Sequence, residues 1–335
     1  MKAVFLERPG PIEGNPLRYG ELADPVAGPG EIVVRVRCCG VCRTDLHVAE
    51  GDLAPKRTRI VPGHEVVGVV ESAGLGCTRF AAGDRVGIAW LRAVCGTCAY
   101  CRRGRENLCP NARFTGWDHD GGYAELAVVR EDFAYAIPEA IDDEHAAPLL
   151  CAGIIGYRAI KRAGVQPGAT VGLYGFGGSA HLAIQVLKHW NCRVYVMSRG
   201  GIHQGLAEEL GADWTGSAAE HPPAPLDAAI LFAPAGELVP AALRALDRGG
   251  ILAVAGIYLS PVPELAYERD LFYERELRTV TANTRADGHE FLRIAGEIPI
   301  ETYTVGMDLA DANRALTMLK HDELRGAAVL HVSTP

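Results

Sequence analysis

A glycine-rich turn after an apolar strand constrains this chain more than any other feature. Residues 171–180 read VGLYGFGGSA, a G-x-G-G-x-A pattern between an apolar run and a helix-forming segment. Gly175 allows the tight turn, Gly177 and Gly178 let backbone amides approach a pyrophosphate, and a small residue at 180 lets the helix pack on the strand. The motif by itself is also compatible with a plain glycine turn. Its strand–turn–helix context favours dinucleotide binding.

The residues around this turn predict alternating strands and helices. We expect strands at 170–174, 193–197, 228–233, 251–255 and 277–281, and helices at 151–164, 179–189, 202–210 and 238–246. Alternating strand–helix units imply a doubly wound parallel sheet, and hence an α/β fold class.

The region before residue 150 has a different texture, because short β-like runs are broken by Gly and Pro, as in the alternating strand 31–37. A chain of 335 residues suggests about two domains. The last part, a helix at 308–320 and a strand at 327–332, could rejoin this first, all-β region.

Four cysteines interrupt the β pattern with the spacing C-x2-C-x2-C-x7-C. They are Cys95, Cys98, Cys101 and Cys109. Cysteines three residues apart are poorly placed to form a disulfide but can converge on one tetrahedral zinc ion. The last gap is too long for the bacterial ferredoxin pattern. We predict a structural zinc lobe near 95–109, with free thiols or an iron–sulfur cluster as alternatives.

A second metal-capable set is spread over three segments. His64 and Glu65 lie side by side in the apolar run 61–68, where a buried ionisable pair is costly unless it is matched by charge, hydrogen bonds or a metal. A lone histidine there would be a core residue. With Cys42 and Cys151 it completes two thiols and one imidazole, the ligand set of a catalytic zinc that keeps a position open.

The second strand of the doubly wound sheet ends in Ser198 and Arg199, with no acid between 193 and 204. A carboxylate there would bind the ribose 2′-hydroxyl of NAD. A hydroxyl and a guanidinium instead suit a 2′-phosphate. We therefore predict a preference for NADP(H), against the alternative that Arg199 is a solvated surface arginine.

Charge and apolar runs exclude several classes of partner. The formal net charge of -8 speaks against a nucleic-acid or anionic-membrane partner. No apolar run approaches the roughly 20 residues of a membrane helix, and the first residues have no signal-peptide core. We expect a cytoplasmic protein, in which ten cysteines serve metal chemistry rather than disulfides.

These motifs, taken in order, resemble the zinc-dependent medium-chain alcohol dehydrogenases. The segment 281–288, TANTRADG, and the pair Ser198-Arg199 resemble a bacterial cinnamyl-alcohol-dehydrogenase-like branch. The resemblance implies a GroES-like β catalytic domain, residues 1–150 and 290–335, with a Rossmann domain, residues 151–289, inserted. It also implies two zinc ions per chain and a homodimer or homotetramer. Ala180 in place of the third glycine and the missing acid after the second strand depart from the family pattern.

The resemblance also implies individual roles. Cys42, His64 and Cys151 would bind the catalytic zinc, with Glu65 beside it and Asp45 accepting the free ring N–H of His64. Thr44 would pass a proton from the alcohol toward His47. Thr44 could instead cap a helix, and His47 could be a surface histidine.

Further residues are expected around the cofactor and the substrate. Arg43 and Arg325 resemble positions that touch the pyrophosphate, although a solvated arginine is the default for each. Trp90 and Trp117 are candidate walls of an apolar substrate pocket, with core packing as the alternative for Trp117.

The expected activity is hydride transfer between NADP(H) and a small primary alcohol or aldehyde. One alternative is an NAD-linked polyol or secondary-alcohol dehydrogenase, which would share every zinc ligand. Another is a non-catalytic NADPH-binding or zinc-binding protein.

Overall fold

The computed structural model describes residues 1–332, and the chain forms two compact units. Unit 1 contains Met1–Cys151 and the chain from Ala282 onward, and unit 2 contains Ala152–Thr281. The return to unit 1 comes at Ala282 rather than at residue 290, because helix α9 (Arg285–Glu297) packs inside unit 1. A Cβ at Gly288 would meet the Tyr135 ring at 2.4 Å, so the helix and that ring are in close contact.

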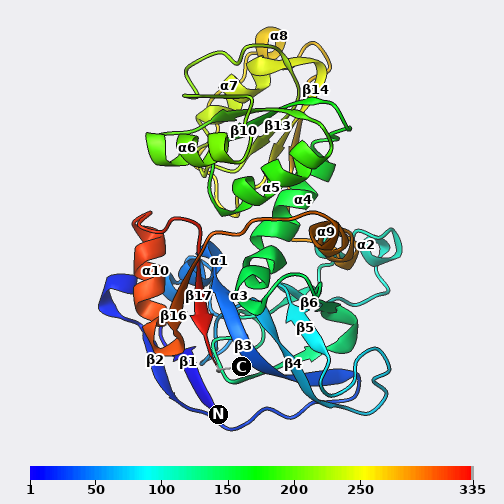
Figure 1. Cartoon of the computed structure of the whole chain (residues 1–335), viewed down its shortest axis with the longest axis vertical. Coiled ribbons are helices and arrows are strands. Elements are labelled where there is room, and N and C mark those ends of the chain that lie inside the picture. Colours follow the sequence, from blue (N-terminus) through cyan, green and yellow to red (C-terminus); the bar gives the residue numbers. More distant parts are fainter. Residues whose placement is uncertain (333–335) are drawn as a thin grey trace. The chain divides into compact units, whose positions relative to one another are not determined.

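Unit 2 is built on a six-stranded parallel sheet in the order β12-β11-β10-β13-β14-β15. The strands are β10 (Thr170–Tyr174), β11 (Arg193–Met197), β12 (Trp214–Gly216), β13 (Leu226–Leu231), β14 (Leu246–Val254) and β15 (Glu276–Thr279). The helices are α4 (Ala152–Arg162), α5 (Gly178–His189), α6 (Gly201–Glu209), α7 (Leu238–Ala245) and α8 (Tyr267–Asp270) (Figure 1). This sheet confirms the predicted doubly wound fold.

The glycine-rich turn lies where the strand order reverses. Strand β10 pairs with β11 on one side and β13 on the other, so helices leave the sheet toward opposite faces around it. Strands β10, β11 and β13 are apolar along almost their whole length because both faces of a parallel sheet are covered. Ligands of such sheets bind at this switch point.

Unit 1 contains a mainly antiparallel sheet in the order β16-β17-β3-β4-β5-β9, with β8 also paired to β3. The strands are β3 (Glu31–Val41), β4 (Glu65–Ala73), β5 (Arg85–Ile88), β8 (Leu126–Arg130), β9 (Ala134–Ala136), β16 (Thr304–Asp308) and β17 (Ala327–His331). The tail rejoins the first region as expected, since β17 pairs with the end of β3, placing Val329 opposite Gly40. Helix α10 begins at Ala312 rather than 308, because Leu309–Asp311 form a 3-10 turn.

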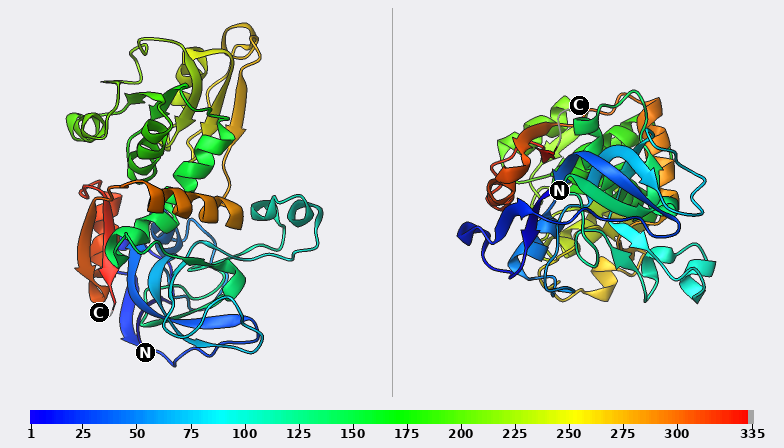
Figure 2. Two further views of the ribbon diagram at one scale, coloured as in Figure 1. Left: turned by 45° about the vertical axis from the view of Figure 1, so that its right-hand side comes forward. Right: turned by 90° about the horizontal axis from the view of Figure 1, so that it is seen from below.

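Smaller elements complete unit 1. Strands β1 (Lys2–Leu6) and β2 (Leu17–Glu21) pair with each other, as do β6 (Leu91–Ala93) and β7 (Arg113–Phe114). The short helices are α1 (Arg43–Glu50), α2 (Ala99–Arg102), α3 (Asp143–Ala146) and α10 (Ala312–Lys320). The four-cysteine lobe, which contains α2, projects from the sheet and lies beside α9 (Figure 2). Across residues 1–332, no helix combines the length and apolar character that a membrane crossing requires.

Candidate metal and dinucleotide sites

Three segments that are distant in sequence bring Cys42, His64 and Cys151 together. Cys42 lies between β3 and α1, His64 directly precedes β4, and Cys151 follows the 3-10 turn Ala147–Leu150. One ligand atom from each of these residues, and one carboxylate oxygen of Glu65, lie within 4.8 Å of one another. The sulfurs of Cys42 and Cys151 are 3.7 Å apart and are not bonded as a disulfide.

The carboxylate of Asp45 holds this cluster in place from behind. Its Oδ1 accepts a hydrogen bond from the Gly63 amide at 3.0 Å and lies 3.1 Å from Nδ1 of His64. Its Oδ2 accepts from the Cys42 amide at 3.0 Å and from the Tyr123 hydroxyl at 3.3 Å. Asp45 is only 1% exposed, and these four donors compensate the cost of its burial. In the neutral imidazole with Nδ1 donating to Asp45, Nε2 of His64 keeps its lone pair for a ligand.

Two glycines are required for this arrangement. A side chain at Gly40 would overlap the Glu65 carboxylate. Gly63 has φ of +93°, and a Cβ there would meet the Tyr123 ring at 2.4 Å. Sequence reasoning missed Gly40 and Tyr123 as parts of the site. The glycine pair before Tyr123 signals close packing, but nothing in the sequence distinguishes this tyrosine from an ordinary core residue.

The cluster has the chemical character of a cation site. Within residues 1–332, Nε2 of His64 and Oε2 of Glu65 are buried and have no hydrogen-bond partner. Burial, assisted by the neighbouring Cys42 thiolate, raises the pKa of Glu65 well above its ordinary value. The hydrogen bond from Cys151 lowers the pKa of Cys42 well below its ordinary value. Unpaired buried polar atoms beside a thiolate are costly without a ligand, and one nitrogen with two sulfurs suits zinc.

Helix α1 carries the two candidate proton carriers. Its N-cap is Cys42, whose sulfur accepts from the Thr44 amide, so Thr44 is not the capping residue. The reason is that Cys42 keeps an extended backbone, with φ of -117°, whereas Thr44 lies inside the helix. The Thr44 hydroxyl is 3.7 Å from the Cys42 sulfur. His47 lies one turn further, partly exposed, with Nδ1 2.8 Å from Asp52.

The four cysteines of the lobe also converge. Their sulfurs are separated by 3.9 Å (Cys95 and Cys101), 3.5 Å (Cys98 and Cys101) and 3.5 Å (Cys95 and Cys109). A tetrahedron with metal–sulfur bonds of about 2.3 Å has edges of about 3.8 Å. The backbone amides of Cys95, Cys98 and Cys101 donate to sulfurs of the same set. The set therefore fits a tetrahedral zinc ion.

The lobe is tied to α9 through Glu106. Its carboxylate accepts hydrogen bonds from the Arg285 amide at 2.8 Å and from the Arg285 guanidinium at 2.7 Å. Arg285 also donates to Asp132 and lies 4.4 Å above the Phe133 ring. Burial raises the pKa of Glu106, but the hydrogen bonds from Arg285 outweigh this effect and lower the pKa below its ordinary value.

Trp90 and Trp117 belong to one row of aromatic rings beside His64. The His64 and Trp90 ring centroids are 6.2 Å apart, and those of Trp90 and Trp117 are 6.5 Å apart. Phe114 stacks on Trp90 at 4.2 Å. Neither tryptophan is fully buried, so the row has surface to offer a ligand.

The glycine-rich turn of unit 2 has the geometry of a phosphate site. Gly175 has φ of +86°, and its amide donates to the Met197 carbonyl. A Cβ at Gly177 would meet no heavy atom within 4 Å, so the space above it is open. Helix α5 begins at Gly178 without a side-chain cap, which leaves its first amides available to an anion.

Ser198 and Arg199 follow the carboxyl end of β11. Ser198 is 7% exposed, and its carbonyl accepts from the Gln204 side chain at 3.1 Å. Arg199 is exposed. In unit 1, the guanidinium of Arg43 pairs with Asp322, and that of Arg325 lies 5.4 Å above the Tyr303 ring. Neither of these two arginines is merely solvated.

Comparisons with known proteins cover nearly the whole chain. Residues 28–139 match the Alcohol dehydrogenase GroES-like domain. A probable alcohol dehydrogenase from Mycobacterium tuberculosis is 53% identical, over 98% of this chain and 97% of that protein. A cinnamyl alcohol dehydrogenase from Sorghum bicolor is 30% identical with a TM-score of 0.89, over 98% of both chains. A cobalt- and zinc-bound thermostable alcohol dehydrogenase from Pyrobaculum aerophilum is 29% identical with a TM-score of 0.89, over 99% of both chains.

Proposed function

The chain belongs to the zinc-type medium-chain alcohol dehydrogenase family, and on that premise we propose that it interconverts a small primary alcohol and its aldehyde with NADP(H). The observation that carries this proposal is the cluster of Cys42, His64 and Cys151 beside Glu65, with buried polar atoms left without a hydrogen-bond partner. The related enzyme from Pyrobaculum aerophilum, which binds zinc, supports the same metal.

Cys42, His64 and Cys151 would hold the catalytic zinc. Zinc bound there would supply Lewis-acid polarisation of the substrate oxygen. Asp45 fixes the imidazole so that Nε2 of His64 faces the ligand position. Glu65, buried next to the three ligands, would assist the exchange of substrate and water. The cysteines of the lobe would hold a second, structural zinc.

Thr44 and His47 would move the proton between the substrate and solvent. The Thr44 hydroxyl lies beside the Cys42 sulfur, and His47 lies on the same helix three residues later, hence on the same face. His47 reaches solvent and is oriented by Asp52. His47→Gln should slow alcohol oxidation most at low pH, and an unchanged pH–rate profile would remove His47 from the path.

The turn at Gly175, Gly177 and Gly178 would bind the pyrophosphate of NADP(H). The nicotinamide of the bound cofactor would supply the hydride chemistry. Ser198 and Arg199 would bind its 2′-phosphate, because both lie where an NAD enzyme places a carboxylate. Arg43 and Arg325 are proposed as further cofactor contacts.

A homo-oligomer is the proposed assembly, as a homodimer or homotetramer. Strand β15 is an outer strand of its sheet, so its second edge offers unpaired backbone groups. Exposed apolar side chains lie on and before this strand, namely Tyr267, Phe272, Tyr273 and Leu277. Light scattering would test this. We also propose a cytoplasmic location, because six of the ten cysteines lie in metal-capable clusters, a use of thiols that is typical of a reducing compartment.

The decisive test joins metal content and initial rates. We expect two zinc ions per chain, one for each cluster. We also expect measurable initial rates with NADPH or NADP on a panel of primary aldehydes and alcohols. One zinc ion and no turnover would instead support a non-catalytic protein with a structural lobe.

Cofactor choice has its own test. Ser198→Asp combined with Arg199→Ala should shift the ratio of kcat/KM for NADPH and NADH toward NADH. A ratio that stays the same would contradict the assignment of the 2′-phosphate to these residues.

A further inference from the structure

We propose that Lys56 selects aldehydes and alcohols that carry an anionic group, such as a carboxylate, at the end opposite to the reacting oxygen. The inference rests on the proposed function and deepens it by naming a substrate class. Its basis is a row of rings that starts at the metal-capable cluster and ends under the Lys56 ammonium.

The row is continuous within unit 1. From the His64 ring the steps are 6.2 Å to Trp90 and 6.5 Å from Trp90 to Trp117. The Lys56 ammonium lies 4.8 Å from the centroid of the Trp117 ring, a favourable cation–π distance. A substrate that is long enough to follow these rings, with its reacting oxygen at the cluster, would point its other end toward a positive charge.

The loop that carries Lys56 is fixed to the same ring. The indole N–H of Trp117 donates to the Ala54 carbonyl at 3.0 Å. Because Lys56 is two residues further along, its backbone is held near Trp117 while its side chain is exposed. The ammonium is thus placed by the fold and still accessible to a ligand.

The charge of Lys56 is not neutralised by the protein. The neighbouring carboxylates are engaged elsewhere: Asp52 with His47, Asp118 with Arg113, and Asp120 with Arg57. Over residues 1–332, Lys56 has no carboxylate within ion-pairing distance. An uncompensated cation in a chain of net charge -8 would attract an anionic ligand group.

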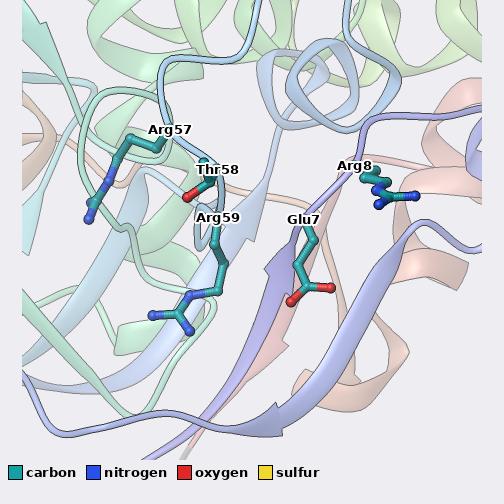
Figure 3. A pocket seen from close by; sticks show the side chains of 5 residues that line it. All are labelled: Glu7, Arg8, Arg57, Thr58 and Arg59. Atoms are coloured by element: carbon teal, nitrogen blue, oxygen red, sulfur yellow. The ribbon is translucent and has the colours of Figure 1, made fainter.

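A surface hollow on the same loop contains cations that, unlike Lys56, do not lie at the tryptophan row. It has a volume of about 640 Å³ and is lined by Glu7, Arg8, Arg57, Thr58 and Arg59. The arginine side chains point in different directions and do not converge on one position (Figure 3). Arg59 lies 5.9 Å from the Phe5 ring and not at the tryptophan row. Arg59 therefore gives a matched control with the same charge on the same loop.

The experiment compares Lys56→Met and Arg59→Met with the wild type. Four aldehydes are reduced with NADPH at low ionic strength: 4-carboxycinnamaldehyde, the longer 4′-formylbiphenyl-4-carboxylate and the methyl ester of each. We expect Lys56→Met to lower kcat/KM for at least one of the acids by about three- to fivefold, the range of a partly exposed ion pair. The esters should be unaffected, and added salt should reduce the wild-type preference.

Three results would overturn the inference. The first is an equal loss for acid and ester of both lengths in Lys56→Met. The second is no loss for either acid. The third is the same acid-selective loss in Arg59→Met, which would indicate only the overall charge of the loop. If the wild type reduces the esters but Lys56→Met shows no acid-selective loss, the inference about Lys56 fails and the proposed function stands. If it reduces none of the four aldehydes, the proposed function fails with it.

Discussion

The two cysteine-containing clusters of unit 1 are built in opposite ways. The lobe takes all four sulfurs from fifteen consecutive residues, Cys95–Cys109, and its own backbone amides hydrogen-bond those sulfurs. The other cluster takes Cys42, His64 and Cys151 from three distant segments and depends on one buried carboxylate, Asp45, to join two of them. The first organises itself locally, whereas the second requires the folded sheet.

This difference predicts how substitutions affect each cluster. A local set needs few other residues, and three of its four cysteines are partly accessible to solvent. A set gathered from distant segments gains a buried, preorganised environment, and every supporting residue becomes necessary for its geometry. We therefore expect damage to the buried cluster to remove activity and damage to the lobe to reduce stability.

Replacing a ligand in the buried cluster should have the largest effect. Cys151→Ser should remove the metal of that cluster and lower kcat/KM by more than about 100-fold, because even residues behind the ligands contribute 10–100-fold. The lobe should keep its own metal. Metal analysis with activity assays checks this, and Cys77→Ser, outside both clusters, is the control. Retained activity with one metal ion per chain would contradict the assignment.

Asp45→Asn should have the next largest effect. An amide can accept hydrogen bonds only through its oxygen, so one pair of donors among Gly63, His64, Cys42 and Tyr123 loses its acceptor. We expect a loss of roughly 10–100-fold in activity or zinc affinity. The control is Asp24→Asn, at an exposed carboxylate outside both clusters and the proton path. Equal behaviour of the two variants would show that Asp45 does not organise the cluster.

Glu106→Gln should act on stability rather than on chemistry. It removes charge-assisted hydrogen bonds from Arg285, and we expect a loss of about 1–3 kcal/mol in the free energy of unfolding at pH 7. The pKa of Glu106 is lowered in the folded chain, so its contribution is present above its ordinary value of 4.5 and is lost as the pH falls through the folded value. Urea unfolding at pH 7 and below pH 4.5 measures this. The free energies of unfolding of the variant and the wild type should become similar at the lower pH.

The control for Glu106→Gln is Glu139→Gln, at an exposed position. A difference between Glu106→Gln and wild type that does not change with pH would contradict the ion-pair explanation.

The smallest effect concerns the thiols of the metal-free lobe. Hydrogen bonds from the amides of Thr97 and Cys98 lower the pKa of Cys95 to about 6, and desolvation raises that of Cys101 to about 12. At pH 7 Cys95 is therefore mainly a thiolate and should be alkylated first, with Cys101 much slower. Mass spectrometry of peptides from chelator-treated protein measures these rates. Equal rates would mean that the lobe loses its backbone–sulfur hydrogen bonds without metal.

Much of the fold follows from sequence periodicity. The predicted strands 170–174 and 193–197 coincide with β10 and β11, because buried apolar runs between glycine turns have few other solutions. Strand β12 was missed because it has only three residues. Helix α9 was missed although Thr284 and Asp287 form a capping box, since its first turn is short of apolar residues.

The site was less accessible to sequence reasoning. The spacing of the four cysteines predicts their convergence, but only the fold brings Cys151 to within 3.7 Å of Cys42. Tyr123 donates one hydrogen bond to Asp45, and its ring reaches this position because it packs against the backbone of Gly63. Residue types alone do not reveal such a contact. Position 44 was open to a capping role, and the structure assigns the cap to Cys42, because sulfur too can accept an amide hydrogen.

The pairing of β17 with β3 sets an order of events during synthesis. The whole of unit 2 is continuous in the chain and can leave the ribosome and fold as a unit. Strand β3 is synthesised early, and the edge of its last residues stays unpaired until residues 327–331 have been synthesised. A chain interrupted upstream of β17 would thus expose a bare strand edge next to Cys42, which makes truncated products prone to aggregate.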